Sequence, residues 1–378
     1  SCVRGALGPR SAGRGAEGAS GMSGRAAHAA GRGALRCAVL IVATCPAFVW
    51  TRAGEAIHVA HYNMLASYLG DNREPWFLLP LNLSGQERDA VLASYYEKSP
   101  EGEYQHGFAD GFGGALSLEQ RRLVEGYQDH FRWSSRRPRI MDLVRGWKAD
   151  LFSIVEMDRF EEFREELSDV YEGAFAKRPR RKSRDGSSLF WRRARFELVG
   201  CPRNVTFQDW EPCHDRVHHE DRVMLVAALR DRADGGVFVV ASVHLMRNPE
   251  DKGKDPLRML EVSQMMRALS CFMGEVDASG LILMGDFNAV PESFTHLFLL
   301  HGWQDCPAAD KGVRDAFDDC CWNRTGVCTT RTAARSVWID YIFYSGRTME
   351  LVEPPPVEPC PDGAIPDAEH PSDHLPVR

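Results

Sequence analysis

The sequence has no apolar run long enough to cross a membrane as a helix, which takes roughly 20 residues. Its longest such run, residues 37–50, holds 14 apolar or small residues behind Arg36. That length suits the apolar core of a secretory signal or part of an organellar transit peptide, and a disordered extension is the alternative. We therefore expect a cytoplasmic protein, or an organellar or secretory one if this segment is a targeting signal.

The sequence also lacks the C-x-x-C spacing of a zinc ribbon, although it contains eleven cysteines. Four of them lie within 23 residues: Cys306, Cys320, Cys321 and Cys328. Disulfides would be expected among these four only if the protein is secreted. The spacing favours ordinary thiols and leaves the disulfide state open.

Lysine and acidic residues are nearly missing from the first 54 residues, which hold seven arginines, no lysine and one acid, Glu17. Subtracting them leaves 46 − 7 = 39 basic and 53 − 1 = 52 acidic residues, so residues 55–378 carry a net charge near −13. We predict a leader over 1–54 and one domain over 55–378, truncated at its C-terminus. A domain this acidic is not an obvious binder of RNA.

One run departs from that acidic balance. Residues 177–184, KRPRRKSR, contain six basic residues and no acid. The run could meet a nucleic-acid backbone beside Asp185, or it could be a solvated loop. The sequence leaves both interpretations open.

Short apolar strands alternate with helical stretches between residues 55 and 378. Apolar runs bounded by turn residues predict strands at 56–65, 150–156, 187–192, 196–200, 222–230, 236–245, 281–285 and 336–345. Helical spacing predicts helices at 116–131, 137–147, 158–167 and 256–274, and one that begins near Pro291. Strand pairs joined by short turns, with helices between them, predict an α/β four-layer sandwich: two packed, mixed and mainly antiparallel sheets flanked by helices.

Polar residues stand where the predicted strands end. The strand at 281–285 is followed by Asp286-Phe287-Asn288, whose first and third side chains point to the same side of an extended chain. Burying several unpaired charges is costly, so a gathered set of carboxylates needs a cation. Oxygen ligands suit Mg²⁺ or Mn²⁺, which also bind phosphate oxygens. Similar strand ends occur at Asn63, Glu156, His244, Asp340 and Asp373-His374.

Seven stretches, in this order, resemble the endonuclease/exonuclease/phosphatase superfamily: YNML (62–65), VEMD (155–158), DGSSLFWRRARFEL (185–198), SVHL (242–245), LMGDFNAVPES (283–293), IDYIFYS (339–345) and PSDHLPV (371–377). Within it, the chain is most similar to the branch of nocturnin, the carbon-catabolite-repressor-type poly(A) deadenylases and 2′-phosphodiesterase. The resemblance covers about 55–378. It implies a deoxyribonuclease I-like catalytic domain that uses Mg²⁺, with Mn²⁺ as a possible substitute.

The resemblance assigns metal and water roles to residues of three motifs. Glu156 matches the principal Mg²⁺ ligand, with Asn63 beside it. Asp286 matches the aspartate that activates the attacking water or holds a second metal. Asn288 matches its partner, which contacts the scissile phosphate.

Two histidines complete the catalytic set that the resemblance implies. His374 matches the active-site histidine and Asp340 the acid that holds it, an arrangement that favours imidazolium and stabilises negative charge in the transition state. His244 matches a second phosphate contact, and Asp373 is a candidate for support of the metal. Asp185 matches a position that contacts substrate in the deadenylases.

The predicted function is a Mg²⁺-dependent phosphodiesterase, a 3′-5′ exoribonuclease of the deadenylase type acting on RNA or a nucleotide. The alternatives are a nocturnin-like phosphatase on a dinucleotide 2′-phosphate and a catalytically silent binding module with the same fold. The chain lacks the aromatic residue that deadenylases carry shortly after their T-H-L motif, which argues against a strong preference for poly(A). The sequence identifies no protein partner.

Overall fold

The computed structural model describes residues 48–51, 56–68, 83–89, 96–98, 104–106, 116–210, 217–218, 221–301, 313–315, 326–345, 349–353 and 359–378. The chain divides after Thr44, and all of the described residues belong to the compact unit Cys45–Arg378. That unit is built around two six-stranded sheets.

The first sheet has a parallel pair at its centre. β2 and β5 are parallel, and the other neighbours are antiparallel. Because parallel neighbours end at the same edge, the last residues of β2 and β5 lie together. The strand order is β18 (Glu350–Glu353), β1 (Phe48–Thr51), β2 (Ile57–Asn63), β5 (Leu151–Val155), β7 (Gly186–Arg192) and β6 (Tyr171–Lys177).

The second sheet repeats this plan. Its parallel pair is β12 with β13, and the remaining neighbours are antiparallel. β13 reads as a continuous apolar run, as expected of a strand buried on both faces. The strand order is β14 (Val313–Asp315), β17 (Asp340–Ser345), β13 (Leu281–Asp286), β12 (Val237–His244), β11 (Val223–Asp231) and β8 (Phe196–Thr206).

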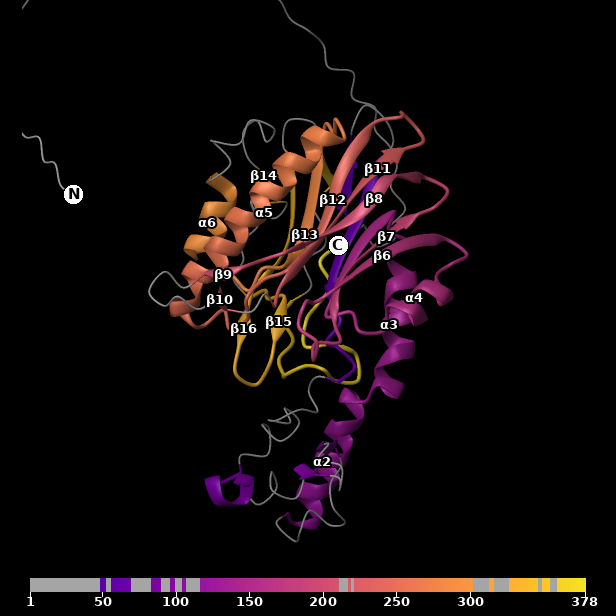
Figure 1. The fold of residues 1–378 in the computed structure, drawn as a ribbon. Coiled ribbons are helices and arrows are strands. Elements are labelled where there is room, and N and C mark those ends of the chain that lie inside the picture. Colours follow the sequence, from indigo (N-terminus) through magenta and orange to yellow (C-terminus); the bar gives the residue numbers. More distant parts are fainter. Residues whose placement is uncertain are drawn as a thin grey trace, which may run out of the picture. The chain divides into compact units, whose positions relative to one another are not determined.

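Helices cover the outer faces of the two sheets (Figure 1). α3 (Trp133–Trp147) and α4 (Phe160–Glu166) pack on the first sheet through a cluster that includes Val144 and Phe163. α5 (Asp255–Glu275) packs on the second sheet. The remaining elements are α2 (Leu118–Phe131), α6 (Phe294–His301), η3 (Lys252–Lys254), β3 (Tyr96–Lys98), β4 (Tyr104–His106), β9 (Asp209–Trp210), β10 (Val217–His218), β15 (Thr330–Arg331) and β16 (Ser336–Val337).

The main apolar core lies between the two sheets and under α5. Among the polar contacts that join the two sheets is a 2.6 Å hydrogen bond between the hydroxyls of Ser153 on β5 and Ser242 on β12. The predicted α/β sandwich of two mixed sheets flanked by helices is confirmed.

Several elements differ from those predicted, two of them near the site. α3 begins at Trp133 rather than at residue 137, with Pro138 inside it, because Arg136 in its first turn is buried and donates to the Phe131 and Met64 carbonyls. Strand β6 was not predicted, since YEGAFAK contains a glycine and does not alternate cleanly. As an edge strand it needs apolar residues on only part of its length.

Strand β1 lies inside the segment that the sequence assigns to the leader. It pairs with β2 on one side and with β18 on the other. The boundary expected at residue 54 therefore falls after the first strand of the sheet. Residues 1–47 of the predicted leader lie outside the described residues.

Cys328 forms a disulfide with Cys360, so it is not the ordinary thiol that the cysteine spacing favoured. Its partner lies in the C-terminal segment, far in sequence from the cysteine cluster. Cys306, Cys320 and Cys321 lie outside the described residues. Within the described ranges, no helix combines the length and apolar character needed to cross a membrane.

In the second sheet, Gly285 packs closely against the backbone of the neighbouring strand β12. A methyl group there would lie 2.3 Å from the Val243 carbonyl oxygen on the neighbouring strand. We expect Gly285→Ala to lower the free energy of unfolding by about 1–3 kcal/mol, because a backbone carbonyl cannot move aside. Urea unfolding followed by circular dichroism measures this change.

Gly274→Ala is the matched control. A Cβ at this position in α5 meets no atom within 4 Å. The substitution should be neutral or stabilising by up to about 1 kcal/mol, since alanine favours a helix. Equal destabilisation by both substitutions would contradict the packing account.

Candidate active site

Strand register brings polar side chains from both sheets to one edge. In the second sheet, His244 pairs with Asp286, which also pairs with Asp340 of β17. In the first sheet, Asn63 pairs with Val155, so Glu156 follows directly at the same edge. The two central parallel pairs therefore deliver the polar strand ends that the sequence predicted.

The carboxamide of Asn63 connects the two sheets. Its Nδ2 donates to Asp286 Oδ2 at 3.0 Å and to Glu156 Oε1 at 3.4 Å, and lies 3.4 Å from His374 Nε2. The second oxygen of Glu156 accepts a hydrogen bond from the Ala66 amide at 3.1 Å. Two carboxylates from different sheets thus converge on one amide group.

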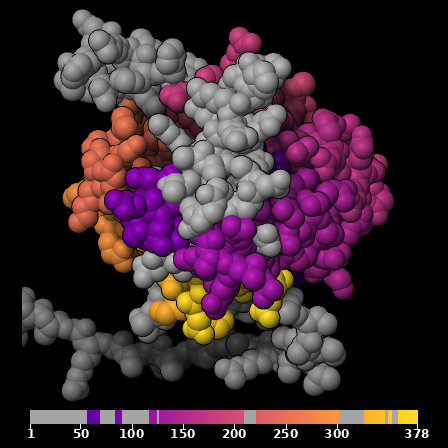
Figure 2. Space-filling view, turned by 90° about the horizontal axis from the view of Figure 1, so that it is seen from below, coloured from indigo at the N-terminus to yellow at the C-terminus, as the bar shows by residue number. Residues whose placement is uncertain are grey.

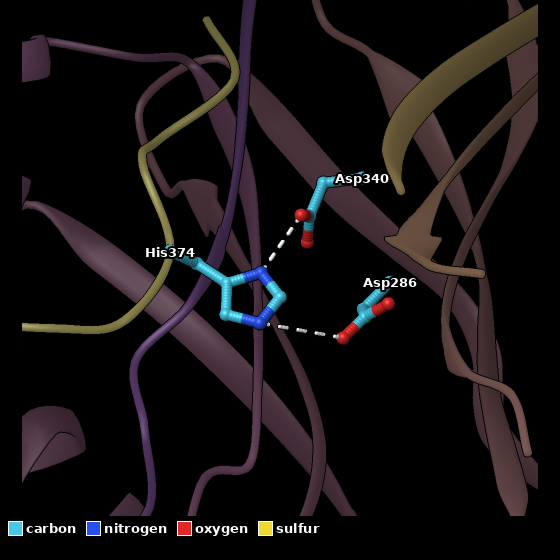
Figure 3. A group of neighbouring side chains, drawn as sticks. All are labelled: Asp286, Asp340 and His374. Atoms are coloured by element: carbon cyan, nitrogen blue, oxygen red, sulfur yellow. Dashed lines mark hydrogen bonds and ion pairs between the residues drawn. The ribbon is translucent and has the colours of Figure 1, made fainter. Parts of the chain in front are cut away.

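His374 and Asp340 form a buried ion pair. Figure 3 shows His374 between two carboxylates, with Nδ1 2.8 Å from Asp340 Oδ2 and Nε2 3.8 Å from Asp286 Oδ2. The other oxygen of Asp340 lies 3.3 Å from His61 Nε2. His61 Nδ1 in turn lies 3.2 Å from the Ser153 hydroxyl. Asp340 is therefore fixed by two imidazoles.

The pKa values of this pair move in opposite directions. Burial alone would lower the pKa of His374, but Asp340 and Asp373 raise it to about 10. Burial alone would raise the pKa of Asp340, but the charge and hydrogen bond of His374 hold it at about 2. At neutral pH the pair is an imidazolium with a carboxylate.

Glu156 and Asp286 behave differently because neither has a matching cation. Burial, followed by the charges of Asp373 and Asp185, raises the pKa of Glu156 to about 7. Burial, followed by the charge of Asp340, raises the pKa of Asp286 to about 6. The site therefore carries carboxylates that a bound cation would stabilise in their charged form.

His244 is neutral in this setting. Burial, together with the charges of Arg222 and Arg178, holds the pKa of His244 well below its usual value. Its Nε2 lies 3.5 Å from Asp286 Oδ2. Its buried Nδ1 has no hydrogen-bond partner among the described residues.

Asn288, two residues after the end of β13, adopts a left-handed backbone conformation with φ at 48°. Its amide N–H donates to Asp286 Oδ1 at 2.9 Å, and its Nδ2 donates to the Leu245 carbonyl at 3.3 Å. The first bond orients the carboxylate of Asp286. The second leaves one N–H of the Asn288 side chain without a hydrogen bond to any described residue.

The C-terminal segment that carries His374 is tied to several elements. The Ser372 hydroxyl donates to the Asn63 carbonyl at 2.7 Å, and Arg136 of α3 donates to the Pro371 carbonyl at 3.2 Å. Strand β15 forms a β-bridge with His374. Figure 2 shows C-terminal residues in yellow beside helical residues in purple.

Asp185 does not join this cluster directly. It is buried, accepts a hydrogen bond from Tyr68, and forms an ion pair with Arg178 at 3.2 Å. Its charge reaches the site by raising the pKa of Glu156. The predicted residues that the structure does bring together are Asn63, Glu156, His244, Asp286, Asn288, Asp340, Asp373 and His374.

This arrangement agrees with the comparison to known families. A model described as the endonuclease/exonuclease/phosphatase family matches residues 124–374. The chain belongs to this family. Members of the family are hydrolases of phosphoester bonds, which is the chemistry that the residues at the sheet edge suit.

Relatives within the family are distant. Carbon catabolite repressor protein 4 homolog 4 of Arabidopsis thaliana is 22% identical over 304 residues, covering 65% of this chain and 70% of that protein. The CCR4-Not complex 3′-5′-exoribonuclease subunit Ccr4 of Aspergillus niger is 24% identical over 305 residues, covering 64% of this chain and 46% of that protein. The chain thus spans less than half of the second relative.

A solved structure of the human Nocturnin catalytic domain with bound sulfate anion is similar in fold. Its TM-score is 0.54 at 19% identity, covering 87% of this chain and 93% of that chain. Together, these similarities match the nocturnin and carbon-catabolite-repressor branch of the endonuclease/exonuclease/phosphatase family that the motifs resembled.

Two residues that support this family's site were not recognised in the sequence. His61 precedes Asn63 by two positions on a strand, so the two side chains share a face, and this signal was available. Arg136 lies outside the seven motifs of the resemblance. Its contacts with the Met64 and Pro371 carbonyls depend on distant segments that local spacing does not reveal.

Asp340→Asn should remove the carboxylate that keeps His374 protonated. We expect the His374 imidazole to be protonated at pH 8 in the native protein and a larger share of it to be neutral in the variant, because the largest charge that opposes burial is then missing and only Asp373 and Asp286 oppose it. Nuclear magnetic resonance of ¹⁵N-histidine-labelled protein distinguishes the two states.

The same substitution should change stability in a defined pH window. The raised histidine pKa contributes stability below about 6.5 that is lost as the pH rises through about 10. The lowered aspartate pKa contributes stability above about 3.8 that is lost as the pH falls through about 2. The loss of Tm in Asp340→Asn should therefore be largest between pH 3.8 and 6.5. The exposed Glu369→Gln serves as control, and a Tm loss that is independent of pH would contradict the ion pair.

Proposed function

We propose that the chain is a Mg²⁺-dependent phosphodiesterase, and specifically a 3′-5′ exoribonuclease of the deadenylase type. The observation that supports metal-assisted chemistry is a pair of carboxylates, the buried Asp286 and the partly buried Glu156, which share the amide of Asn63. The exoribonuclease activity is supported by the Aspergillus niger relative, whose name states it.

The donor set fits a hard divalent cation. Glu156 and Asp286 offer carboxylate oxygens, which Mg²⁺ and Mn²⁺ prefer. Asn63 would present its amide oxygen to the same ion after a flip of its carboxamide, because Nδ2 faces the two carboxylates and Oδ1 accepts a hydrogen bond from the Leu65 amide at 3.2 Å. When bound there, the ion would neutralise charge on the substrate phosphate. Asp340 and His374 are committed to each other by their ion pair, so we assign them no metal, although their polar atoms and those of Asp286 all lie within 4.8 Å of one another.

Other polar side chains of the site would transfer the proton and stabilise charge on the phosphate. Asp286, with a pKa of about 6, can accept a proton from the attacking water at neutral pH. His374 donates a hydrogen bond from its protonated ring to a phosphate oxygen, and Asp340 maintains that protonation. Asn288 would offer its remaining N–H to the same phosphate. His244 would offer its Nδ1, which makes no hydrogen bond to a described residue and lies 4.0 Å from Glu156 Oε1.

Asp185 remains a proposed contact for the substrate. Its carboxylate already accepts from Tyr68 and Arg178, so a substrate hydroxyl or amine would use its remaining lone pairs. This contact would place the substrate between the loop after β2 and the start of β7.

Metal binding should be visible in stability. Without metal, the native protein should lose stability relative to Glu156→Gln as the pH rises from 4.5 through about 7, because the raised pKa of Glu156 disfavours its charged form in the fold. Millimolar Mg²⁺ should raise the Tm of the native protein at pH 8 and leave that of Glu156→Gln nearly unchanged. Differential scanning fluorimetry measures both effects.

Glu165→Gln is the matched control for this experiment. Glu165 lies on α4, is exposed, and carries the same charge. Its variant should respond to Mg²⁺ like the native protein. The absence of a Mg²⁺ response in native protein, or an equal response in Glu156→Gln, would refute the proposed ligand set.

Activity is tested on three substrates with Mg²⁺: RNA with a 3′-oligoadenylate tail, a dinucleotide with a 2′-phosphate, and an inositol polyphosphate. We expect single nucleotides to be released from the 3′ end of the RNA. Glu156→Gln should lower the rate by at least about 100-fold, whereas Glu165→Gln should not change it. Denaturing gels and free-phosphate detection provide the readouts.

The other outcomes identify the alternatives. Free phosphate from the dinucleotide alone would replace the exoribonuclease with a nocturnin-like phosphatase. Hydrolysis of no substrate, together with no Mg²⁺ effect on Tm, would replace it with a silent binding module.

A further inference from the structure

The hairpin of β6 and β7 carries the basic run of the sequence to the active site. Lys177, the last residue of β6, pairs with Gly186, the first of β7, and the Arg178 amide donates to the Asp185 carbonyl at 3.0 Å. The Gly186 carbonyl also accepts from the Met157 amide at 3.1 Å. The base of this hairpin therefore lies one residue from Glu156. We refer to residues 177–184 as the basic loop.

The base of the basic loop is fixed by ion pairs. The Arg178 guanidinium contacts the carboxylates of both Asp185 and Asp221, and its Nε donates to the Asp221 carbonyl at 2.9 Å. Arg180 Nε lies 3.6 Å from Asp221. The two acids next to the loop are thus already neutralised by its first two arginines.

The rest of the basic loop is left with uncompensated positive charge. Arg181, Lys182 and Arg184 are exposed, and no carboxylate of a described residue lies within ion-pair distance of them. Lys177 is also exposed and adds a further positive charge. Its ammonium group donates to the Arg178 and Arg180 carbonyls, and these hydrogen bonds stabilise the loop. In a domain whose net charge is near −13, this concentration of cations opposes the overall field.

We propose that the basic loop binds the sugar–phosphate backbone of single-stranded RNA next to the scissile end; this inference rests on the proposed function. Consecutive exposed cations suit a polyanion rather than one phosphate, because each exposed contact contributes only about 0–1 kcal/mol. At a Debye length of about 8 Å, the loop acts on nearby phosphates and not across the whole molecule.

The loop binds without selecting bases. Residues 177–184 contain no aromatic side chain on which a base could stack. Contacts to phosphates position a nucleic acid but carry no direct sequence information. The loop therefore increases affinity for RNA of any sequence, including RNA without a poly(A) tail.

The test compares two triple variants that remove the same charge. The loop variant carries Arg181→Gln, Lys182→Gln and Arg184→Gln. The control variant carries Arg193→Gln, Arg230→Gln and Arg267→Gln, all at exposed positions. Arg193 follows β7 at the end opposite Gly186, and Arg230 is near the end of β11, so two of these charges are removed away from the site.

Binding is measured first, by fluorescence anisotropy with a 20-nucleotide RNA in a Glu156→Gln background, so that cleavage plays no part. At 50 mM salt the loop variant should bind about 10- to 100-fold more weakly, and the control variant within about 2-fold of its parent. The slope of log Kd against log salt should fall by about 2 in the loop variant, since each phosphate contact contributes about 0.7. An unchanged slope, or equal losses in both variants, would overturn the proposal.

Cleavage separates this inference from the proposed function. The loop variant should have a raised KM for the 20-nucleotide RNA, the native kcat, and the native rate on a trinucleotide too short to reach the loop. An equal loss of rate on the trinucleotide would overturn the proposal. If the native protein binds the long RNA through the loop but cleaves neither RNA, the proposed exoribonuclease fails and the binding surface stands.

Discussion

Burial of three carboxylates within reach of one imidazole is the constraint on which this structure depends. Asp286 and Asp340 lie on neighbouring strands and are buried, and Glu156, which follows β5, keeps 15% of its side chain exposed. Only Asp340 has a full countercharge, in His374, so its pKa is low while those of the other two are raised. An isolated buried charge is expensive unless it is paired or bound to a metal. The fold therefore separates a permanent ion pair from a pair of carboxylates that a cation can stabilise.

The two sheets hold the ion pair and the other two carboxylates in position. Each sheet has a central parallel pair, and both pairs end at the same edge, so the polar residues are delivered by registered strands. The chain then turns sharply: Glu156 and Asn288 both have positive φ, at 56° and 48°. Non-glycine residues adopt this conformation at a cost of roughly 1–2 kcal/mol. Such strain, one residue after β5 and two residues after β13, is typical of functional sites whose geometry the surrounding packing imposes.

The sequence predicted the part of the site that follows local rules. The ends of the strands, and the shared side of Asp286 and Asn288 at i and i+2, could be predicted from the local sequence. The order of the motifs placed Glu156 and His374 in the same site although they are separated by more than half of the chain. Contacts between segments that are far apart in the sequence could not be predicted. Arg136 binds carbonyls far away in sequence, and Cys328 joins Cys360 rather than a neighbour in the cysteine cluster. The edge strand β6 was missed because it contains a glycine and does not alternate cleanly, and this strand places the basic loop beside the site.

The central claim, that Glu156 with Asn63 and Asp286 forms a cation site distinct from the Asp340–His374 pair, is tested most directly by anomalous diffraction from crystals soaked in Mn²⁺. The account predicts an anomalous peak in contact with the Glu156 carboxylate, with the Asp340–His374 hydrogen bond intact. The peak should be missing in Glu156→Gln. A peak coordinated by His374 and Asp340, or persistence of the peak in Glu156→Gln, would contradict the account.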